Sequence, residues 1–253
     1  MVDQKIIVLF GGSGLIGRAV VEGLVSKNDI PVIVSRQSSD DLCKLFSKEI
    51  VDKCHFESAD ITDPESITKC LESVYDNFGR VDAVVNCTWP RNKNYGAVFE
   101  DVTYGDFKEN TLDHIGGAFN VCQKAVILFQ RQGYGNIINF SSIYGVVPPR
   151  FSLYEGLPMT KEVEYCVAKS SIIMLTEYLG SYLKGQNIRV NCISPGGILN
   201  NQNETFIERY NAECSNKGML EAKDILGAIL FLLSEESRYI QGHNLIVDDG
   251  FVL

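Results

Sequence analysis

The sequence lacks the features by which membrane, disulfide-rich and nucleic-acid-binding proteins are usually recognised. No apolar segment reaches the roughly 18 residues of a membrane span, and no basic stretch leads into a long apolar run near Met1. The 8 cysteines form no Cys-x-x-Cys pair, so free thiols in a reducing cytosol explain them better than disulfides or a zinc site. The formal net charge of −9 disfavours nucleic acid and anionic membranes as partners. We therefore expect a soluble cytoplasmic protein without a metal.

The sequence also has no linker rich in proline, glycine or serine and no internal repeat. Short, continuous apolar runs recur instead, as in strands buried on both faces of a parallel sheet. They lie at Ile6–Phe10, Val32–Val34, Val81–Val85, Ile137–Phe140, Ile188–Ile193 and Leu245–Val247, with a weaker run at His55–Phe56. Amphipathic stretches between them predict helices at Ile16–Val25, Ile67–Tyr75, Phe119–Phe129, Ser170–Leu183 and Ile225–Leu233. This alternation predicts one α/β domain over residues 1–253, a Rossmann-type doubly wound parallel sheet with helices on both faces.

A glycine-rich run follows the first predicted strand, at the end of the sheet where ligands of such folds bind. Residues 11–17 read Gly-Gly-Ser-Gly-Leu-Ile-Gly and lead into a helix, whose first amides would face a pyrophosphate. Glycines at this spacing permit a tight turn and a close backbone approach. The run predicts a dinucleotide site formed by Gly11, Ser13, Gly14, Leu15, Ile16 and Gly17.

Residues after the next strands extend the predicted cofactor groove. Arg36 stands where a carboxylate would bind a ribose 2′-hydroxyl, and an arginine suits a 2′-phosphate. NADP(H) is therefore the expected cofactor and NAD(H) the alternative, unless Arg36 is only a solvated loop residue. Asp60 and Ile61 are expected near the adenine. Asn86 either lines the groove beside Cys87 or stabilises the central sheet.

The segment 141–169 carries the predicted chemistry. Tyr165 and Lys169 are four residues apart, which puts both side chains on one face of a helix. One ammonium about 4 Å from a phenol supplies about 4 kcal/mol in favour of the phenolate at an effective dielectric near 20. Tyr165 would then exchange a proton with a substrate oxygen while hydride moves to or from the cofactor. Ser142 follows a buried strand and offers a hydroxyl to the substrate carbonyl.

The next strand ends in Pro195 and Gly196, which bend the chain over the expected nicotinamide position with Ile198 close by. A Tyr-x-x-x-Lys spacing alone is common by chance and fits an ordinary surface helix. Its occurrence together with Ser142, this turn and the glycine run makes the catalytic interpretation the stronger one.

These residues resemble the short-chain dehydrogenase/reductase family over nearly the whole chain. The shared marks are the glycine run, Asp60, Asn86, Ser142, Tyr165, Lys169, Pro195-Gly196 and the terminal Val247-Asp248-Asp249-Gly250. The resemblance implies that Ser142 positions the substrate, that Tyr165 is the acid/base, and that Lys169 holds the cofactor ribose and tunes the tyrosine. It also implies a homotetramer or homodimer packed through the helix of Tyr165 and through the C-terminal region.

Three features depart from the family pattern. The glycine spacing is similar to that of a longer, sugar-modifying branch of the family. Asn86 is followed by Cys-Thr-Trp-Pro rather than Ala-Gly. His114 stands where the family has an active-site asparagine, and it is either a proton relay through Lys169 and water or a structural residue.

The separation of Ser142 and Tyr165, 165 − 142 = 23 positions, is longer than usual in the family. This insertion, positions 86–92 and the His114 segment resemble a subgroup, the flagellin-modification oxidoreductases of bacterial nonulosonic (legionaminic-type) acid pathways. That resemblance implies an amino-sugar or sugar-phosphate substrate. Arg91 and Tyr154 are expected to contact it, and residues 197–219 are expected to form a lid that excludes water.

Two other functions stay open at this point. A general 3-ketoacyl or carbonyl reductase would share the same catalytic residues and would favour a basic surface for an acyl carrier. A cofactor-binding regulator without turnover would keep the fold alone. The joint presence of Ser142, Tyr165 and Lys169 argues against the regulator.

Overall fold

The computed structural model describes residues 4–253, so the first three residues of the predicted domain lie outside the described part. A single seven-stranded sheet runs through it in the order β3-β2-β1-β4-β5-β6-β7, with every neighbouring pair parallel. The strands are β1 Ile6–Phe10, β2 Ile30–Ser35, β3 His55–Ser58, β4 Ala83–Asn86, β5 Gly135–Phe140, β6 Ile188–Pro195 and β7 Asn244–Val247. The predicted doubly wound parallel sheet is confirmed. Its order reverses between β1 and β4, and folds of this kind bind ligands at such a switch point.

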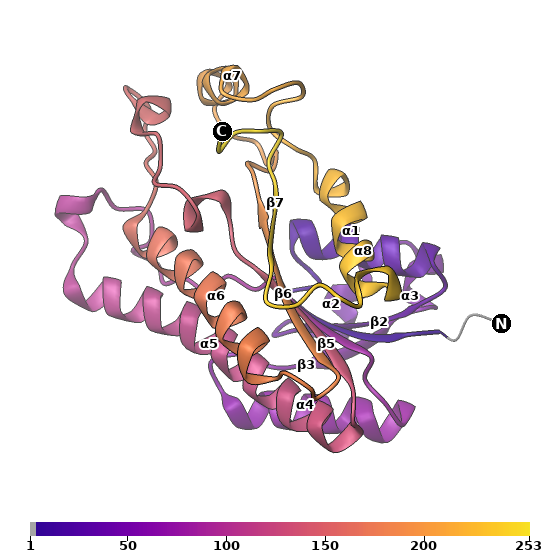
Figure 1. Ribbon diagram of the computed structural model, residues 1–253. Helices are drawn as coiled ribbons and strands as arrows, with labels where there is room; N and C mark the ends of the chain where they lie inside the picture. The colour runs from indigo at the N-terminus through magenta and orange to yellow at the C-terminus, as the bar shows by residue number, and fades with distance from the viewer. Residues whose placement is uncertain (1–3) are drawn as a thin grey trace.

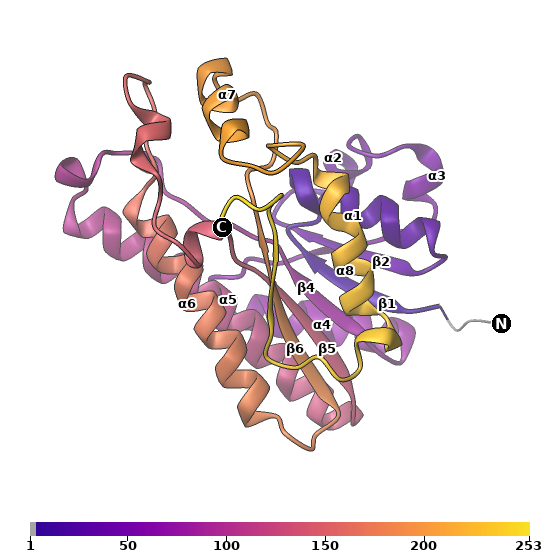
Figure 2. The same cartoon turned by 45° about the horizontal axis from the view of Figure 1, so that its top comes forward.

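Helices cover both faces of the sheet (Figures 1 and 2). The α-helices are α1 Leu15–Ser26, α2 Ser39–Cys43, α3 Lys48–Val51, α4 Pro64–Phe78, α5 Tyr104–Gln132, α6 Val163–Tyr182, α7 Glu204–Ala212 and α8 Leu226–Leu233. Short 3₁₀ turns include η2 Ile143–Gly145 and η3 Phe151–Tyr154. Helices α4, α5 and α6 pack on one face, whereas α1 and α8 pack on the other.

Strand β1 shows why the apolar runs of the sequence are continuous. Ile6, Val8 and Phe10 belong to the core beneath α4, α5 and α6. Ile7 and Leu9 belong to the core beneath α1 and α8. Because successive side chains of a strand point to opposite faces, both sets must be apolar when both faces are covered.

Two helices begin before the amphipathic stretches by which the sequence predicted them. The pattern missed their first turns because the buried side chains there are polar. Helix α5 begins 15 residues before the predicted start (119 − 104), and its buried side includes Asn110 and His114. Helix α6 begins 7 residues before the amphipathic stretch at Ser170 (170 − 163) but only 2 before Tyr165 (165 − 163), where the Tyr-x-x-x-Lys spacing predicted a helix, and its buried residues include Glu164 and Lys169. Apolar periodicity, the signal used to find helices, is interrupted at these positions. Polar side chains buried at the same end of two helices indicate a functional site there.

Candidate active site

A cavity of about 930 Å³ lies at the carboxyl ends of the central strands. It brings together nearly all of the residues predicted from the sequence. Those that line it are Gly11, Ser13, Gly14, Leu15, Ile16, Gly17, Arg36, Asp60, Ile61, Cys87, Arg91, Ser142, Tyr154, Tyr165, Lys169, Pro195, Gly196 and Ile198. Asn86 and His114 do not line it.

The glycine run forms one end of this cavity and fits the pyrophosphate of a dinucleotide. Gly11 adopts a φ of 84°, which side-chain-bearing residues rarely tolerate, and Gly14 donates to the Gly11 carbonyl at 3.0 Å. A Cβ at Gly17 would overlap that same carbonyl oxygen. Gly14 caps α1 without a side-chain hydrogen bond, and the first turn has no acidic residue. The amides that open α1 are therefore available to an anion.

The end of β2 holds polar groups suited to a ribose phosphate. The hydroxyls of Ser13 and Ser35 lie 3.4 Å apart. The Arg36 guanidinium, whose side chain is 73% exposed, lies 3.6 Å from the Asp60 carboxylate. Burial, which would raise the pKa of Asp60, is outweighed by hydrogen bonds from Thr62 and by Arg36, so that pKa is lowered and the carboxyl stays ionised.

Of the two interpretations of Asn86, its contacts favour the structural one. Its Oδ1 accepts hydrogen bonds from the Thr88 amide at 3.2 Å and the Thr88 hydroxyl at 2.6 Å. This holds the turn after β4 in shape. The next residue, Cys87, lines the cavity and donates its thiol to the Phe10 carbonyl at 3.2 Å. The Cys87 thiol thus ties the residue after β4 to the end of β1.

At the other end of the cavity, η2 is held against α6. Ser141 donates its hydroxyl to the Lys169 carbonyl at 2.7 Å, and the Lys169 ammonium donates to the Phe140 carbonyl at 2.9 Å. The Ser142 hydroxyl accepts from the Tyr144 amide at 3.2 Å and lines the cavity. Both serines line the cavity, but the Ser141 hydroxyl already donates to the α6 backbone, so Ser142 is the better candidate to bind a substrate oxygen.

Tyr165 lies in the first turn of α6, where the helix dipole favours an anion. The Lys169 ammonium lies 5.5 Å from the centre of its ring. Burial lowers the pKa of Lys169 to about 8, with the nearby Lys161 contributing in the same direction. Lys169 thus remains mostly charged at neutral pH, which puts a positive charge beside the Tyr165 ring.

Sequence reasoning missed three residues beside Tyr165. The Trp89 ring lies 5.2 Å from the Tyr165 ring, and the Lys161 ammonium lies 3.7 Å from the centre of that ring. Glu162 pairs with Lys161 at 3.0 Å. Lys161 and Glu162 lie in the irregular insertion, which has no periodic pattern to predict their orientation. Only the closeness of Lys161 and Glu162 to Tyr165 in the sequence could have indicated that they lie beside it.

His114 is buried on α5, with 3% of its surface exposed. Its Nε2 has no hydrogen-bond partner within residues 4–253. Burial, assisted by the charge of Lys169, lowers its pKa to about 2. The imidazole is therefore neutral across the physiological range. An unpaired buried nitrogen needs a water or another group, which keeps the predicted relay open.

Replacing His114 by asparagine is expected to reduce the fall in unfolding free energy between pH 7 and pH 5. The pKa rises from about 2 in the folded chain to the usual 6.5 in the unfolded chain. Only the unfolded chain therefore takes up a proton as the pH falls below 6.5, and the native state loses stability there. At pH 5 the loss is about 2 kcal/mol of unfolding free energy. Urea unfolding at pH 7, 6 and 5 measures it, and identical slopes for both proteins would contradict the assignment.

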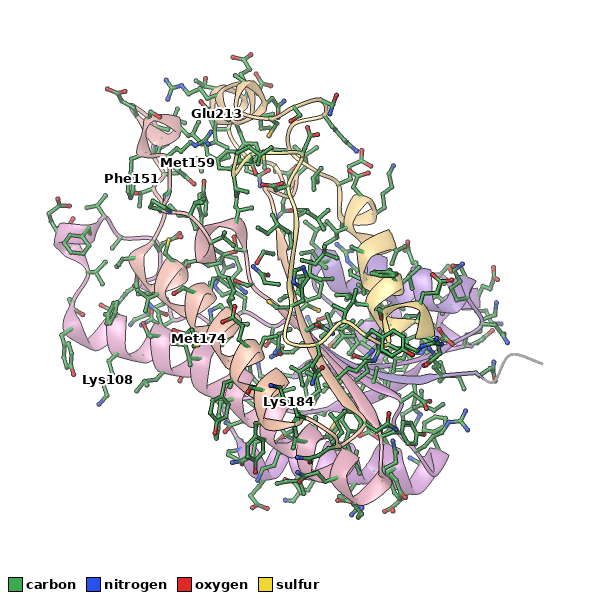
Figure 3. The ribbon with its side chains drawn as sticks, in the orientation of Figure 1. Lys108, Phe151, Met159, Met174, Lys184 and Glu213 are labelled. Atoms are coloured by element: carbon green, nitrogen blue, oxygen red, sulfur yellow. The ribbon has the colours of Figure 1, made fainter. Side chains whose placement is uncertain are left out.

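The insertion between η2 and α6 packs against α7, which lies in the segment predicted as a lid. The Arg209 side chain of α7 donates to the carbonyls of Leu153 and Glu155 at 3.3 and 2.7 Å. Arg150 forms an ion pair with Glu213. Figure 3 shows Phe151 and Met159 of the insertion on the same side of the molecule as Glu213. The Leu220 amide donates to the Gly197 carbonyl at 2.7 Å, so the two ends of the segment lie side by side near the end of β6.

Two negative findings apply to the described residues 4–253. None of their helices is both long and apolar enough to cross a membrane. They contain no group of three or more His, Cys, Asp or Glu side chains arranged to hold a metal ion.

The fold and the site together define a class. A family model described as enoyl-(acyl carrier protein) reductase matches residues 13–252. A short-chain dehydrogenase from Leptospira borgpetersenii, solved with bound NAD⁺, is 31% identical, with a TM-score of 0.88 over 99% of this chain and 94% of that one. The chain belongs to the short-chain dehydrogenase/reductase family, and it is an NAD(P)-dependent oxidoreductase.

Two relatives of known name are similar to the chain over nearly its whole length. The post-translational flagellin modification protein A of Campylobacter coli is 36% identical over 260 residues, covering all of both chains. This confirms the predicted resemblance to the flagellin-modification subgroup. The 3-oxoacyl-(acyl-carrier-protein) reductase FabG of Haemophilus influenzae is 28% identical over 98% of both chains.

Proposed function

We propose that the substrate is a carbonyl or secondary alcohol of an amino-sugar or sugar-phosphate intermediate in bacterial nonulosonic acid synthesis for flagellin glycans. The observation that carries this proposal is the polar wall that η2 and the insertion form at the reacting end. The hydroxyls of Tyr144 and Tyr154 lie 3.0 Å apart, and Lys161 pairs with Glu162 at 3.0 Å. Such paired donors and acceptors suit a substrate with several hydroxyl groups. The full-length similarity to a flagellin modification protein supports the same class.

The residues around the cavity have distinct parts in the proposed reaction. Ser142 holds the substrate oxygen, and Tyr165 donates a proton to it in reduction or takes one in oxidation. Lys169 stabilises the phenolate that forms when the proton has left Tyr165. The lid segment 197–219, anchored to the insertion through Arg209, excludes water.

The glycine run, Asp60, Ile61, Cys87, Pro195, Gly196 and Ile198 would hold the cofactor, whose nicotinamide supplies or accepts the hydride. We propose NADP(H) as the preferred form. Ser13, Ser35 and Arg36 support this preference because two hydroxyls and a guanidinium suit a 2′-phosphate. The Leptospira relative with bound NAD⁺ keeps NAD(H) as the alternative.

The Arg36→Ala variant is expected to bind NADPH at least about tenfold more weakly, because a charge-assisted contact to a phosphate contributes about 1.5–3 kcal/mol. NADH, which has no 2′-phosphate, should bind with little change. Calorimetric titration of both cofactors measures the two dissociation constants. If the affinities for NADPH and NADH fall equally, Arg36 does not contact the 2′-phosphate and has a structural role instead.

A 3-oxoacyl reductase is the second candidate, and the FabG relative and the matching family model favour it. The chain has a net charge of −9, which suits an acidic acyl carrier poorly. The ion pair and the tyrosine hydroxyls at the reacting end also suit a hydroxylated substrate better than an acyl chain.

Nicotinamide absorbance, followed with phosphorylated and nucleotide-linked amino sugars, 3-oxoacyl thioesters and simple ketones, separates the two candidates. We expect kcat/KM for a sugar to exceed that for any thioester by at least about a hundredfold, because polar groups built for hydroxyls are left unpaired by an acyl chain. A preference for a thioester would replace the sugar proposal with the second candidate.

We also propose a cytoplasmic location and a homotetramer or homodimer. Exposed apolar and aromatic side chains on α5 and α6 support assembly. They are Leu112, Phe119, Met174, Tyr178 and Tyr182, of which Figure 3 labels Met174.

A further inference from the structure

Two ammonium groups flank the reacting tyrosine, and the one that the family resemblance does not supply is the nearer to the ring. Lys161 Nζ lies 3.7 Å from the centre of the Tyr165 ring, against 5.5 Å for Lys169 Nζ. A cation at that distance over a ring face attracts the electrons of the ring, and it attracts a phenolate ring more strongly than a neutral one.

Lys161 is held in this position from several sides. Its ammonium also lies 5.7 Å from the Trp89 ring centre and 5.8 Å from the Tyr144 ring centre. Glu162 pairs with it at 3.0 Å, and Glu162 itself accepts a hydrogen bond from Tyr95 at 3.3 Å. Only 15% of the Lys161 side chain is exposed, so solvent screens its charge less than that of a surface lysine. This enclosure fixes one cation against one ring.

Other charged and titratable groups surround Tyr165. Lys169 and Cys166 come from α6, Glu162 from the insertion, Tyr144 from η2, and Arg91 and Tyr95 from the segment after β4. Burial raises the pKa of Tyr144 to about 12, and burial with the charge of Glu162 raises that of Tyr95 further. Both phenols therefore stay protonated at neutral and mildly alkaline pH. The Lys161 and Lys169 ammonium groups lie closest to the Tyr165 ring, and the Glu162 carboxylate opposes Lys161. The Arg91 guanidinium lies over the Trp89 ring instead, and the buried Glu164 carboxylate is next to Tyr165 in α6.

We propose that Lys161 is a positioning residue for proton transfer, an ammonium held by Glu162 over the Tyr165 ring that stabilises the phenolate together with Lys169. Lys161 acts through Tyr165 and transfers no proton itself. Glu162 opposes it, so the pair sets the proton affinity of Tyr165 by a balance of charge. The proposal does not depend on the identity of the substrate.

The chain provides its own reporter for a test. Trp89 is the single tryptophan, and its ring lies 5.2 Å from the Tyr165 ring. A neighbouring tyrosinate quenches tryptophan emission, because its absorption overlaps that emission. Tyr95, 5.5 Å from Trp89, stays protonated for the reason given above. Trp89 emission is titrated with pH in the full chain without cofactor, and each curve is taken as the difference from its Tyr165→Phe counterpart.

We expect the quenching midpoint of Lys161→Met to lie above that of the unsubstituted protein by about one pH unit or more, a tenfold change in proton affinity. Lys161→Arg should restore the midpoint, because it restores the cation. Glu162→Gln should move the midpoint in the opposite direction, downward, which general damage to the packing would not do. An unchanged midpoint in Lys161→Met, or shifts of the same sign in Lys161→Met and Glu162→Gln, would overturn the proposal.

Discussion

Replacing Tyr165 by phenylalanine is expected to lower kcat by about a hundredfold to ten-thousandfold, the usual contribution of a positioned acid or base. The substitution removes one hydroxyl and leaves the ring, with its contacts to Trp89 and Lys161, in place. Cofactor binding should change little, because the glycine run at the other end of the cavity is untouched. Steady-state turnover and a cofactor titration of the same preparation measure both quantities.

Tyr75→Phe on α4 is the matched control, since it deletes a tyrosine hydroxyl remote from the cavity lining. Its turnover should equal that of the unsubstituted protein. Full turnover of Tyr165→Phe would remove Tyr165 from the chemistry and, with it, the assignment of Lys169 as its partner.

The Gly17→Ala variant is expected to weaken cofactor binding by at least about a hundredfold, because two charge-assisted hydrogen bonds to phosphate are together worth about 3 kcal/mol or more. The new Cβ would overlap the Gly11 carbonyl oxygen, so the turn and the start of α1 must separate. The amides that face the pyrophosphate would then move out of position. Calorimetric binding of NADPH, together with the melting temperature, measures the effect.

Gly227→Ala on α8 makes the same chemical change where a Cβ would meet nothing within 4 Å. It should leave cofactor binding unchanged and stabilise the chain by up to about 1 kcal/mol, because alanine favours the helix. Unchanged NADPH affinity in a folded Gly17→Ala protein would mean that the cofactor does not bind at the glycine run.

The fold was predictable from the sequence because parallel strands with two covered faces appear as short, continuous apolar runs. The run Ile6–Phe10 matches β1 residue for residue, since all five side chains are buried. The starts of α5 and α6 were not predictable from apolar periodicity. At those ends the buried side chains are Asn110, His114, Glu164 and Lys169, which a periodic pattern reads as surface. Helix α7 was missed because its short, polar sequence resembles a loop.

The site was predictable where residues follow strands and unpredictable where they lie in irregular chain. Ser142, Tyr165 and Lys169 were expected together, and all three line one cavity. Asn86 does not line the cavity, and its side-chain oxygen accepts hydrogen bonds from Thr88 instead. Lys161 and Trp89 approach Tyr165 from two separate loops. Such a contact depends on tertiary packing, which a single sequence does not encode in any local pattern.

We expect one cavity to hold both the dinucleotide and the reacting tyrosine. Energy transfer from Trp89 to reduced nicotinamide tests it directly, because this single tryptophan lines the cavity beside Tyr165. Titration with NADPH should quench Trp89 emission saturably and give nicotinamide emission on tryptophan excitation, and both signals should be lost in Gly17→Ala. If calorimetry shows that NADPH binds but no energy is transferred from Trp89, the cofactor lies outside the cavity that holds Tyr165.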